Sequence, residues 1–456
     1  MLLLHQVEQA REDAAALEKL YRQAASIGDE ISFREAISQS VRNHPGNLLF
    51  QAWACRLDLD PSLAITESED RAREKQGSRH WWIALMGSAI LGAIYVFLVG
   101  HKIPIPVPGE ATDLFWLGYA PVTAVAILIY LALDGRATKR WQWYAAAALA
   151  VALLGTVTAW MAWGRRDDVA GLTAIHLPFI AWTAVGVGVS LGYRDIAGHN
   201  VAGYNVARQF YGFLVKSAET ILTAGIYMLA GMILIGLSVG IFAALGVTIP
   251  EELMRIVSSA GLGLLPILAL ASLYDSSRAP TDQSWASGLA RLLKILTRLI
   301  LAPALLVLAI YIFWFVPMHF WQPFRERDVL IIYNATIMAI IATLACTVPD
   351  PSEQLSAKAS LMLRYAILTT SSLTFLLNIY ALAAVASRTI SGGLTPNRHA
   401  VLGWNVVTLL ILGFVTLKLW QDKSETWPDA FRGSIARSML PAIAWALWVL
   451  FGLPRF

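Results

Sequence analysis

The chain has 456 residues, of which 57% are hydrophobic and only 14% are charged. A soluble domain has about a quarter charged residues, whereas the mean hydropathy of +0.57 is typical of a polytopic membrane protein. The formal charge of +4 is small, and the basic residues lie in short connectors between apolar stretches. This composition excludes an ordinary soluble globular protein and a nucleic-acid-binding surface. The partners that we expect for the cationic connectors are membrane lipids with anionic headgroups.

Residues 1–79 form the charged part of the chain. Apolar residues recur at helical spacing from Leu2 to Ala25, and shorter helical patterns follow at 31–43 and 47–57. The segment has no short apolar core before a small-residue cleavage site, so it does not resemble a signal peptide. We predict a small helical N-terminal region, ending in a charged linker over 67–79, whose helices can contact a protein partner.

Eleven apolar stretches follow in residues 80–456. Crossing about 30 Å of hydrocarbon takes about 20 apolar residues at a rise of 1.5 Å per residue. Tryptophans near the ends of these stretches, such as Trp81, Trp163 and Trp420, agree with this, because indole rings favour the headgroup level. The sequence therefore predicts an all-α, polytopic integral membrane helix bundle. The predicted spans are 81–100, 114–133, 141–163, 171–193, 218–247, 254–273, 292–316, 329–347, 359–386, 399–420 and 434–453.

The connectors alternate in their content of Lys and Arg. With the N-terminus in the cytoplasm, the inside connectors hold about twice as many of these residues as the outside ones, as positive-inside topology requires. The weakest assignment is the connector 387–398, which places Arg388 and Arg398 outside. The stretch Asn200–Lys216 mixes aromatic and polar residues, which predicts an interfacial amphipathic helix before the fifth span.

The most distinctive motif is RTISGGLTPNR, from Arg388 to Arg398. Thr395 is suited to cap the tenth span and Pro396 to occupy its first helical position. Arg398 then places a cation in a first helical turn, where it opposes the helix dipole unless an anion lies nearby. Two guanidinium groups and free helix N–H groups could hold such an anion; alternatively, the loop is a tight hairpin whose arginines snorkel or pair with acids. The candidate anion- or lipid-binding residues are Arg388, Thr395, Asn397 and Arg398.

This motif resembles the hallmark of the DUF4153 family, a group of uncharacterised bacterial polytopic membrane proteins. The resemblance lies in an arginine, a glycine turn, and then Leu394 to Arg398 opening a hydrophobic helix. The stretch from Leu301 to Tyr311, followed by a loop and two further spans, agrees with it. The resemblance covers about residues 200–420. It implies a multi-pass protein of the bacterial inner (plasma) membrane and no established activity.

Two further features could line a polar cavity. The ninth span has five hydroxyl side chains within six residues, which favours either a hydrated pathway or interhelical hydrogen bonds of about 0.6 kcal/mol each. His176 in the fourth span could relay protons or face a cavity, or it could be a hydrogen-bonded packing residue. The candidate cavity-lining residues are Thr369, Thr370, Ser371, Ser372, Thr374, Asn378 and His176.

Spacing on the spans gives two more expectations. Lys216 and Glu219 lie three apart, on one helix face, either as an interfacial ion pair or as a pair lining a polar cavity. The pairs Gly188/Gly192 and Gly236/Gly240 predict close helix crossings, within the chain or between copies.

No motif in the sequence indicates a nucleotide, a dinucleotide, a zinc ion or a serine nucleophile. The two cysteines, Cys55 and Cys346, do not have metal-ligand spacing, and we expect no cofactor, metal or catalytic residue. We predict a multi-pass inner-membrane protein, not an enzyme, that binds or moves a lipophilic or anionic small molecule. The alternative is a structural or assembly subunit of a larger membrane complex. A third possibility, a transferase acting on lipid-linked substrates, depends on Glu110, Asp113 and His176 lying on the outer side.

Overall fold

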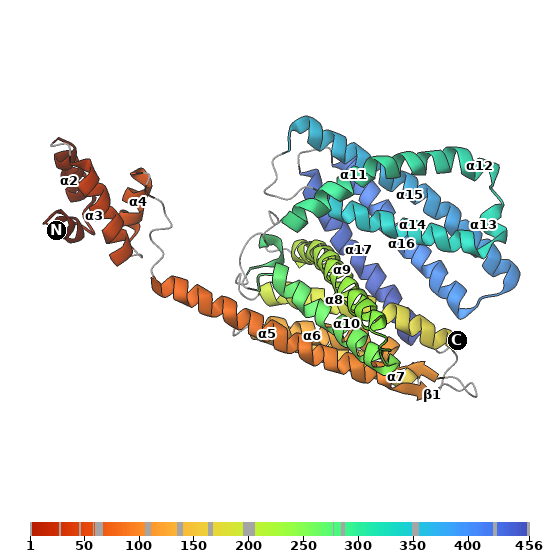
Figure 1. The fold of residues 1–456 in the computed structure, drawn as a ribbon. Helices are drawn as coiled ribbons and strands as arrows, with labels where there is room; N and C mark the ends of the chain where they lie inside the picture. Colours follow the sequence, from red (N-terminus) through yellow and green to blue (C-terminus); the bar gives the residue numbers. More distant parts are fainter. Residues whose placement is uncertain are drawn as a thin grey trace. The chain divides into compact units, whose positions relative to one another are not determined.

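The computed structural model divides into two compact units, Met1–Trp82 and Ile83–Phe456, whose helices are drawn in Figure 1. The residues that the structure describes are 2–26, 29–44, 47–57, 59, 67–104, 111–134, 140–162, 167–194, 206–276, 278–283, 288–348, 355–422 and 426–453.

The first unit contains four short helices around an apolar core of its own. The predicted helix over Leu2–Ala25 is in fact two helices, because Asp13 accepts hydrogen bonds from the N–H groups of Ala15 and Ala16 at 2.9 and 3.0 Å and so starts a new helix. Phe33 and Phe50 are fully buried in the core between the helices. The helices are α1 (Leu2–Gln9), α2 (Ala14–Ser26), α3 (Glu30–Asn43) and α4 (Leu48–Arg56).

An ion pair joins α2 to α4 in this unit. Glu18 accepts hydrogen bonds from Arg56 and, at 2.9 Å, from Arg22 Nε. The bond from Arg56, and then that from Arg22, hold the pKa of the Glu18 carboxyl below its ordinary value of 4.5. A carboxyl whose pKa is lowered by folding stabilises the fold above its unfolded pKa, and this contribution is lost as the pH falls through the folded pKa.

We therefore expect Glu18→Gln to reduce the protection of α2 and α4 amides from hydrogen exchange near neutral pH, but not at a pH well below the lowered folded pKa of Glu18. Exchange is measured in the full-length protein and corrected for the intrinsic exchange rate at each pH. The control is Glu35→Gln, which changes an exposed carboxylate on α3. A loss of protection that is the same at both pH values would contradict the role of the ionised pair.

The second unit is an all-α bundle, and the chain is a multi-pass membrane protein. Eleven helices of the described residues are long and apolar enough to cross a membrane, which confirms the predicted fold class. They are α5 (Glu67–Gly100, which begins in the first unit), α6 (Phe115–Asp134), α7 (Trp141–Ala162), α8 (Asp167–Arg194), α9 (Val206–Ala244), α10 (Glu251–Leu273), α11 (Gly288–Ile310), α14 (Arg327–Thr347), α15 (Ala357–Gly392), α16 (Pro396–Gln421) and α17 (Trp427–Phe451).

Short elements connect some of these helices. The two strands pair in an antiparallel hairpin after α5, and a π-helical turn continues α11 into a short helical segment. These elements are β1 (Lys102–Pro104), β2 (Ala111–Asp113), η2 (Pro280–Asp282), η3 (Tyr311–Phe315), α12 (Val316–Met318) and α13 (Gln322–Arg325).

Two main groups of helices pack within the bundle (Figure 1). In the first group, α5–α8 and α10 share a core that includes the fully buried Leu91, Leu128 and Ile267. In the second group, α11 and α14–α17 pack around residues such as Ile367 and Phe431. Helices α8 and α9 contact α17 and so join the two groups.

The predicted close crossing at Gly188/Gly192 is confirmed. A Cβ added to Gly188 would lie 2.7 Å from the Ala147 Cβ, and one added to Gly192 would lie 3.2 Å from the Tyr144 ring. The glycines therefore let α8 approach α7 closely.

We predicted an interfacial helix over Asn200–Lys216, separate from the fifth span. For residues 206–216 this prediction is wrong, and residues 200–205 lie outside the described residues. Helix α9 runs without a break for 39 residues, and its first turns are buried. Gln209 Nε2 donates to Thr281 Oγ1 at 2.9 Å, and a Cβ on Gly212 would lie 2.7 Å from the Pro280 carbonyl oxygen. The polar face that indicated contact with water therefore contacts η2 instead.

Candidate anion-binding pocket

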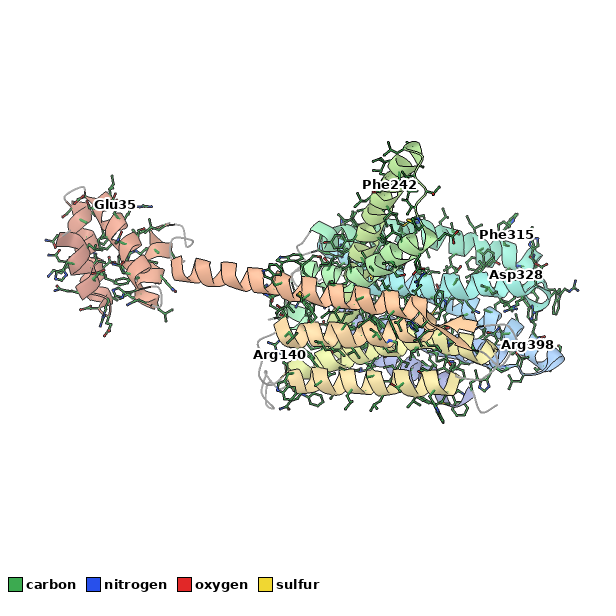
Figure 2. The ribbon with its side chains drawn as sticks, turned by 60° about the horizontal axis from the view of Figure 1, so that its bottom comes forward. Glu35, Arg140, Phe242, Phe315, Asp328 and Arg398 are labelled. Carbon is green, nitrogen blue, oxygen red and sulfur yellow. The ribbon has the colours of Figure 1, made fainter. Side chains whose placement is uncertain are left out.

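Three helix ends enclose a cavity of about 450 Å³ in the membrane unit. It lies between the start of α14, the last turns of α15 and the start of α16, and we call it the arginine pocket. Figure 2 shows Asp328 and Arg398 at this end of the bundle, with Arg140 at the opposite end. Its lining residues are Arg327, Leu330, Ile331, Asn334, Val385, Arg388, Thr395, Asn397, Arg398 and Val401.

The motif folds as its residue types lead one to expect. Thr395 caps α16, since its Oγ1 accepts a hydrogen bond from the Arg398 N–H at 3.3 Å, and Pro396 is the first helical residue. Gly393 has a φ of +80°, a backbone conformation that glycine adopts without strain. The turn also brings the carbonyl oxygen of Gly393 within 2.7 Å of Arg398 Nη1, which donates to it. The backbone of the turn thereby fixes one side of the Arg398 guanidinium.

The neighbouring Gly392 allows this guanidinium to approach the turn closely. A Cβ at residue 392 would lie 2.6 Å from Arg398 Nη1. Gly393 thus permits the positive φ of the turn, and Gly392 leaves room for the Arg398 guanidinium.

The pocket brings together all four residues that the sequence singled out for anion binding, and it adds Arg327 and Asn334 from α14. The sequence pattern does not link this pair to the motif, because they lie more than fifty positions before it. The only sequence signal is topological: the start of the eighth span and the start of the tenth span face the same side of the membrane.

Within the described part of the chain, the arginines of the pocket have no carboxylate partner. Among the described residues, Arg327, Arg388 and Arg398 form no salt bridge. The Nη1 atom of Arg388 is buried and has no hydrogen-bond partner in the described part of the chain. A buried, ionised donor without an acceptor is unfavourable, because it has lost water and gained nothing in return.

Two buried arginines elsewhere in the bundle donate to backbone carbonyls of other segments. Arg140 Nη1 donates to the Ser276 carbonyl at 2.7 Å, and Arg364 Nη2 donates to the Leu419 carbonyl at 2.5 Å. These two arginines tie helix ends together. Arg140 Nε, like Arg388 Nη1, is buried without a partner among the described residues, so what distinguishes the arginine pocket is that three guanidinium groups line one cavity.

The chemistry of the pocket suits an oxyanion. Guanidinium groups make directed, charge-assisted hydrogen bonds to phosphate and carboxylate oxygens. The N-termini of α14 and α16, which lie at this end, add positive partial charge. Arg327 is exposed, whereas Arg388 and Arg398 are half-buried, so the pocket is open to an entering ligand and its electrostatic attraction is screened by salt.

The hydroxyl cluster of the ninth span lies in α15, away from the arginine pocket. Thr370, Ser372 and Thr374 donate to carbonyls four residues back in their own helix, at 2.7–2.8 Å. Thr369 is exposed. These bonds satisfy the hydroxyls within the helix.

Two members of the same group bridge α15 and α16. Asn378 Nδ2 donates to Thr408 Oγ1 at 2.8 Å, and Ser371 Oγ accepts from Thr416 Oγ1 at 3.1 Å. Both Asn378 and Ser371 are fully buried. In this structure they hold two neighbouring helices together.

His176 is buried between α8 and α16. Its Nδ1 donates to the Leu172 carbonyl at 2.8 Å, and its Nε2 accepts from Trp404 Nε1 at 2.6 Å. This pair of bonds assigns a neutral ring protonated on Nδ1. Both ring nitrogens are therefore engaged in packing two helices.

We expect Trp404→Phe to leave His176 Nε2 without its donor and to lower the free energy of unfolding by about 1–3 kcal/mol. The measurement is the thermal midpoint of the full chain in detergent, together with anion binding, which should not change. Trp445→Phe is the matched control, since its indole donates over a longer distance, 3.3 Å, to the Ala400 carbonyl. Equal midpoints for the wild type and Trp404→Phe would contradict a structural role of this bond.

Comparison of the chain with protein-family models, with curated proteins and with solved structures finds no match. Among the residues on which a transferase would depend, Glu110 lies outside the described residues, and His176 makes the two bonds just described.

Proposed function

We propose that this multi-pass membrane protein binds the phosphate-like group of an anionic small molecule in the arginine pocket. One observation carries the proposal: three arginines without a carboxylate partner among the described residues surround one cavity, and a buried donor of Arg388 has no acceptor there. A bound oxyanion would accept from these donors and would remove the cost of leaving them unpaired.

The surroundings of the pocket favour a phosphate carried by a lipid over a free phosphate. The segment that leads into α14 exposes Trp314, Phe320 and Trp321, at 60%, 43% and 63%. Exposed tryptophans of this kind favour the headgroup level of a bilayer. A ligand held by its phosphate at this level could keep its apolar part in the surrounding lipid.

The proposal is tested by lipid retention on the purified full chain. Native mass spectrometry compares phosphatidic acid with the diacylglycerol of the same acyl chains, which lacks the phosphate, and inorganic phosphate is added as a competitor. We expect preferential retention of phosphatidic acid that weakens as salt is raised. Displacement by millimolar phosphate alone would indicate a free anion as the ligand, and equal retention of both lipids with no effect of phosphate would contradict an anion site.

We further propose that the chain lies in a bacterial inner membrane with its N-terminus in the cytoplasm. We also propose that it belongs to the DUF4153 family. The support is the excess of Lys and Arg in alternate connectors and the RTISGGLTPNR motif. In this orientation the arginine pocket faces away from the cytoplasm, on the side where positive-inside topology does not account for arginines.

A pair of cysteine variants checks the orientation. Ser391 and Lys358 are exposed residues at opposite ends of α15. A membrane-impermeant maleimide added to intact cells should label Ser391→Cys and spare Lys358→Cys. The reverse pattern would invert the proposed topology.

One observation favours the alternative, an assembly role. The second half of α9 is exposed on all sides, with Leu234 66% and Leu237 63% exposed, and Figure 2 shows the part of α9 around Phe242 standing apart from the other helices. A Cβ added to Gly236 or Gly240 would meet no described atom within 4 Å. In an assembly role, this surface or the N-terminal helices would contact a second membrane protein. The mass of the protein extracted in detergent tests this role, and a mass equal to that of one chain would count against it.

A further inference from the structure

A second cavity, of about 360 Å³, lies between α5, α6, α8, α9 and α10 and shares no lining residue with the arginine pocket. Two of its lining residues are the helix-interior prolines Pro178 of α8 and Pro266 of α10. Proline removes a backbone hydrogen bond and bends a helix. Both helices continue through these prolines, each of which leaves one backbone hydrogen bond of its helix unmade.

The wall of this cavity is mainly apolar and aromatic. Ile127, Val185, Leu270 and Phe213 contribute large apolar side chains, whereas Ala181 contributes a small one that leaves room. The volume is that of a small-molecule site, typically about 300–1,000 Å³. An apolar wall of this kind gives a water molecule few partners, so the cavity suits a lipophilic occupant.

One donor on this wall has no acceptor. Trp182 lines the cavity, and its Nε1 atom is buried without a hydrogen-bond partner among the described residues. Two hydroxyls that also line the cavity, those of Tyr95 and Thr123, bond to each other at 2.6 Å, and Thr123 donates to the Tyr119 carbonyl. A buried indole N–H normally has an acceptor, and a ligand oxygen would supply one.

The charge of the cavity decides between ligand classes. Of the described residues that line it, Lys216 alone is charged, and its Nζ lies 2.6 Å from Glu219 Oε2, with the two side chains only 3% and 1% exposed. The ammonium is therefore neutralised by a carboxylate of the same helix. A ligand carrying a net charge would be repelled by one member of this pair and would be desolvated at a cost, so the cavity favours a neutral ligand.

We propose that this cavity binds a neutral lipophilic molecule that carries a carbonyl oxygen, and that this oxygen accepts a hydrogen bond from Trp182 Nε1. The site is separate from the anion site in position and in chemistry. The proposal for this cavity and the proposal for the arginine pocket can therefore be disproved independently.

Photo-crosslinking of the full chain in lipid nanodiscs tests the site. The probe is a diazirine-bearing 2-undecanone, and unlabelled 2-undecanone and undecane are the competitors. We expect crosslinks on α6 and α8 beside the cavity, and competition about tenfold stronger for the ketone than for the alkane, as one additional hydrogen bond would give. Crosslinks confined to other surfaces, or equal competition by ketone and alkane, would overturn the proposal.

Two kinds of variant separate the contribution of the hydrogen bond from that of the cavity volume. Trp182→Phe keeps an aromatic ring but removes the N–H, so crosslinking should persist while the preference for the ketone disappears. Ala181→Phe fills the cavity and should abolish crosslinking, and Ala124→Leu repeats this test from α6. Trp445→Phe removes an indole elsewhere and should change nothing.

The unliganded thermal midpoint of each variant establishes that the bundle is folded. Ketone preference that survives in folded Trp182→Phe, or crosslinking that survives in both folded cavity-filling variants, would overturn the proposal.

Discussion

The double substitution Arg388→Gln and Arg398→Gln is expected to weaken the binding of a phosphate-bearing lipid about a hundredfold, and either single substitution about tenfold. Each arginine would contribute a charge-assisted hydrogen bond, and about 1.4 kcal/mol corresponds to a tenfold change in affinity. The two residues are half-buried, so salt screens the interaction only in part. The measurement is the dissociation constant of fluorescently labelled phosphatidic acid for the full chain in detergent.

The matched control is Arg325→Gln. Arg325 is an exposed residue of α13, close in sequence to the start of α14, but it does not line the pocket. Its replacement should change the affinity less than twofold, because an isolated surface charge contributes little. If Arg325→Gln weakened binding as much as Arg398→Gln does, the lipid would be held by general surface charge and not by the pocket.

Gly263→Ala is expected to destabilise the bundle strongly. A Cβ on Gly263 of α10 would lie 2.6 Å from the Gly92 Cα and 2.8 Å from the Gly92 nitrogen, both backbone atoms of α5. Neither atom can move without separating two helices, so the substitution should cost about 1–3 kcal/mol of overpacking. The measurement is the thermal midpoint of the full chain, which should fall by several degrees.

The same helix supplies the control for this prediction. A Cβ on Gly261, two residues earlier in α10, meets no described atom within 4 Å. Gly261→Ala should leave the midpoint unchanged or raise it slightly, because alanine is the better helix former. Equal effects of Gly261→Ala and Gly263→Ala would show that α5 and α10 do not approach each other at Gly92.

The spans and the motif were predictable because their signals are local. Each span shows its own apolar length, and Thr395 and Pro396 precede the tenth span at the spacing of a helix cap. For the same reason the sequence identified four residues of the arginine pocket. It missed Arg327 and Asn334, since their place in the pocket depends on how α14 packs against α15 and α16.

Other features depend on contacts that a pattern does not specify. His176 bonds to Trp404, 228 positions away. The polar face of α9 contacts η2, although the same pattern would suit contact with water. A run of hydroxyls, likewise, gives no sign of whether its donors bond to their own helix, as Thr374 does. The cavity beside Trp182 is lined by residues of five helices, and only the packed bundle reveals it.

Binding of an oxyanion in the arginine pocket can be seen in a side-chain-resolution density map of the full chain in nanodiscs containing phosphatidic acid. We expect a headgroup-sized density within hydrogen-bond distance of Arg388 and Arg398. A map in which the pocket holds only solvent, with both arginines paired to carboxylates of the protein, would contradict it.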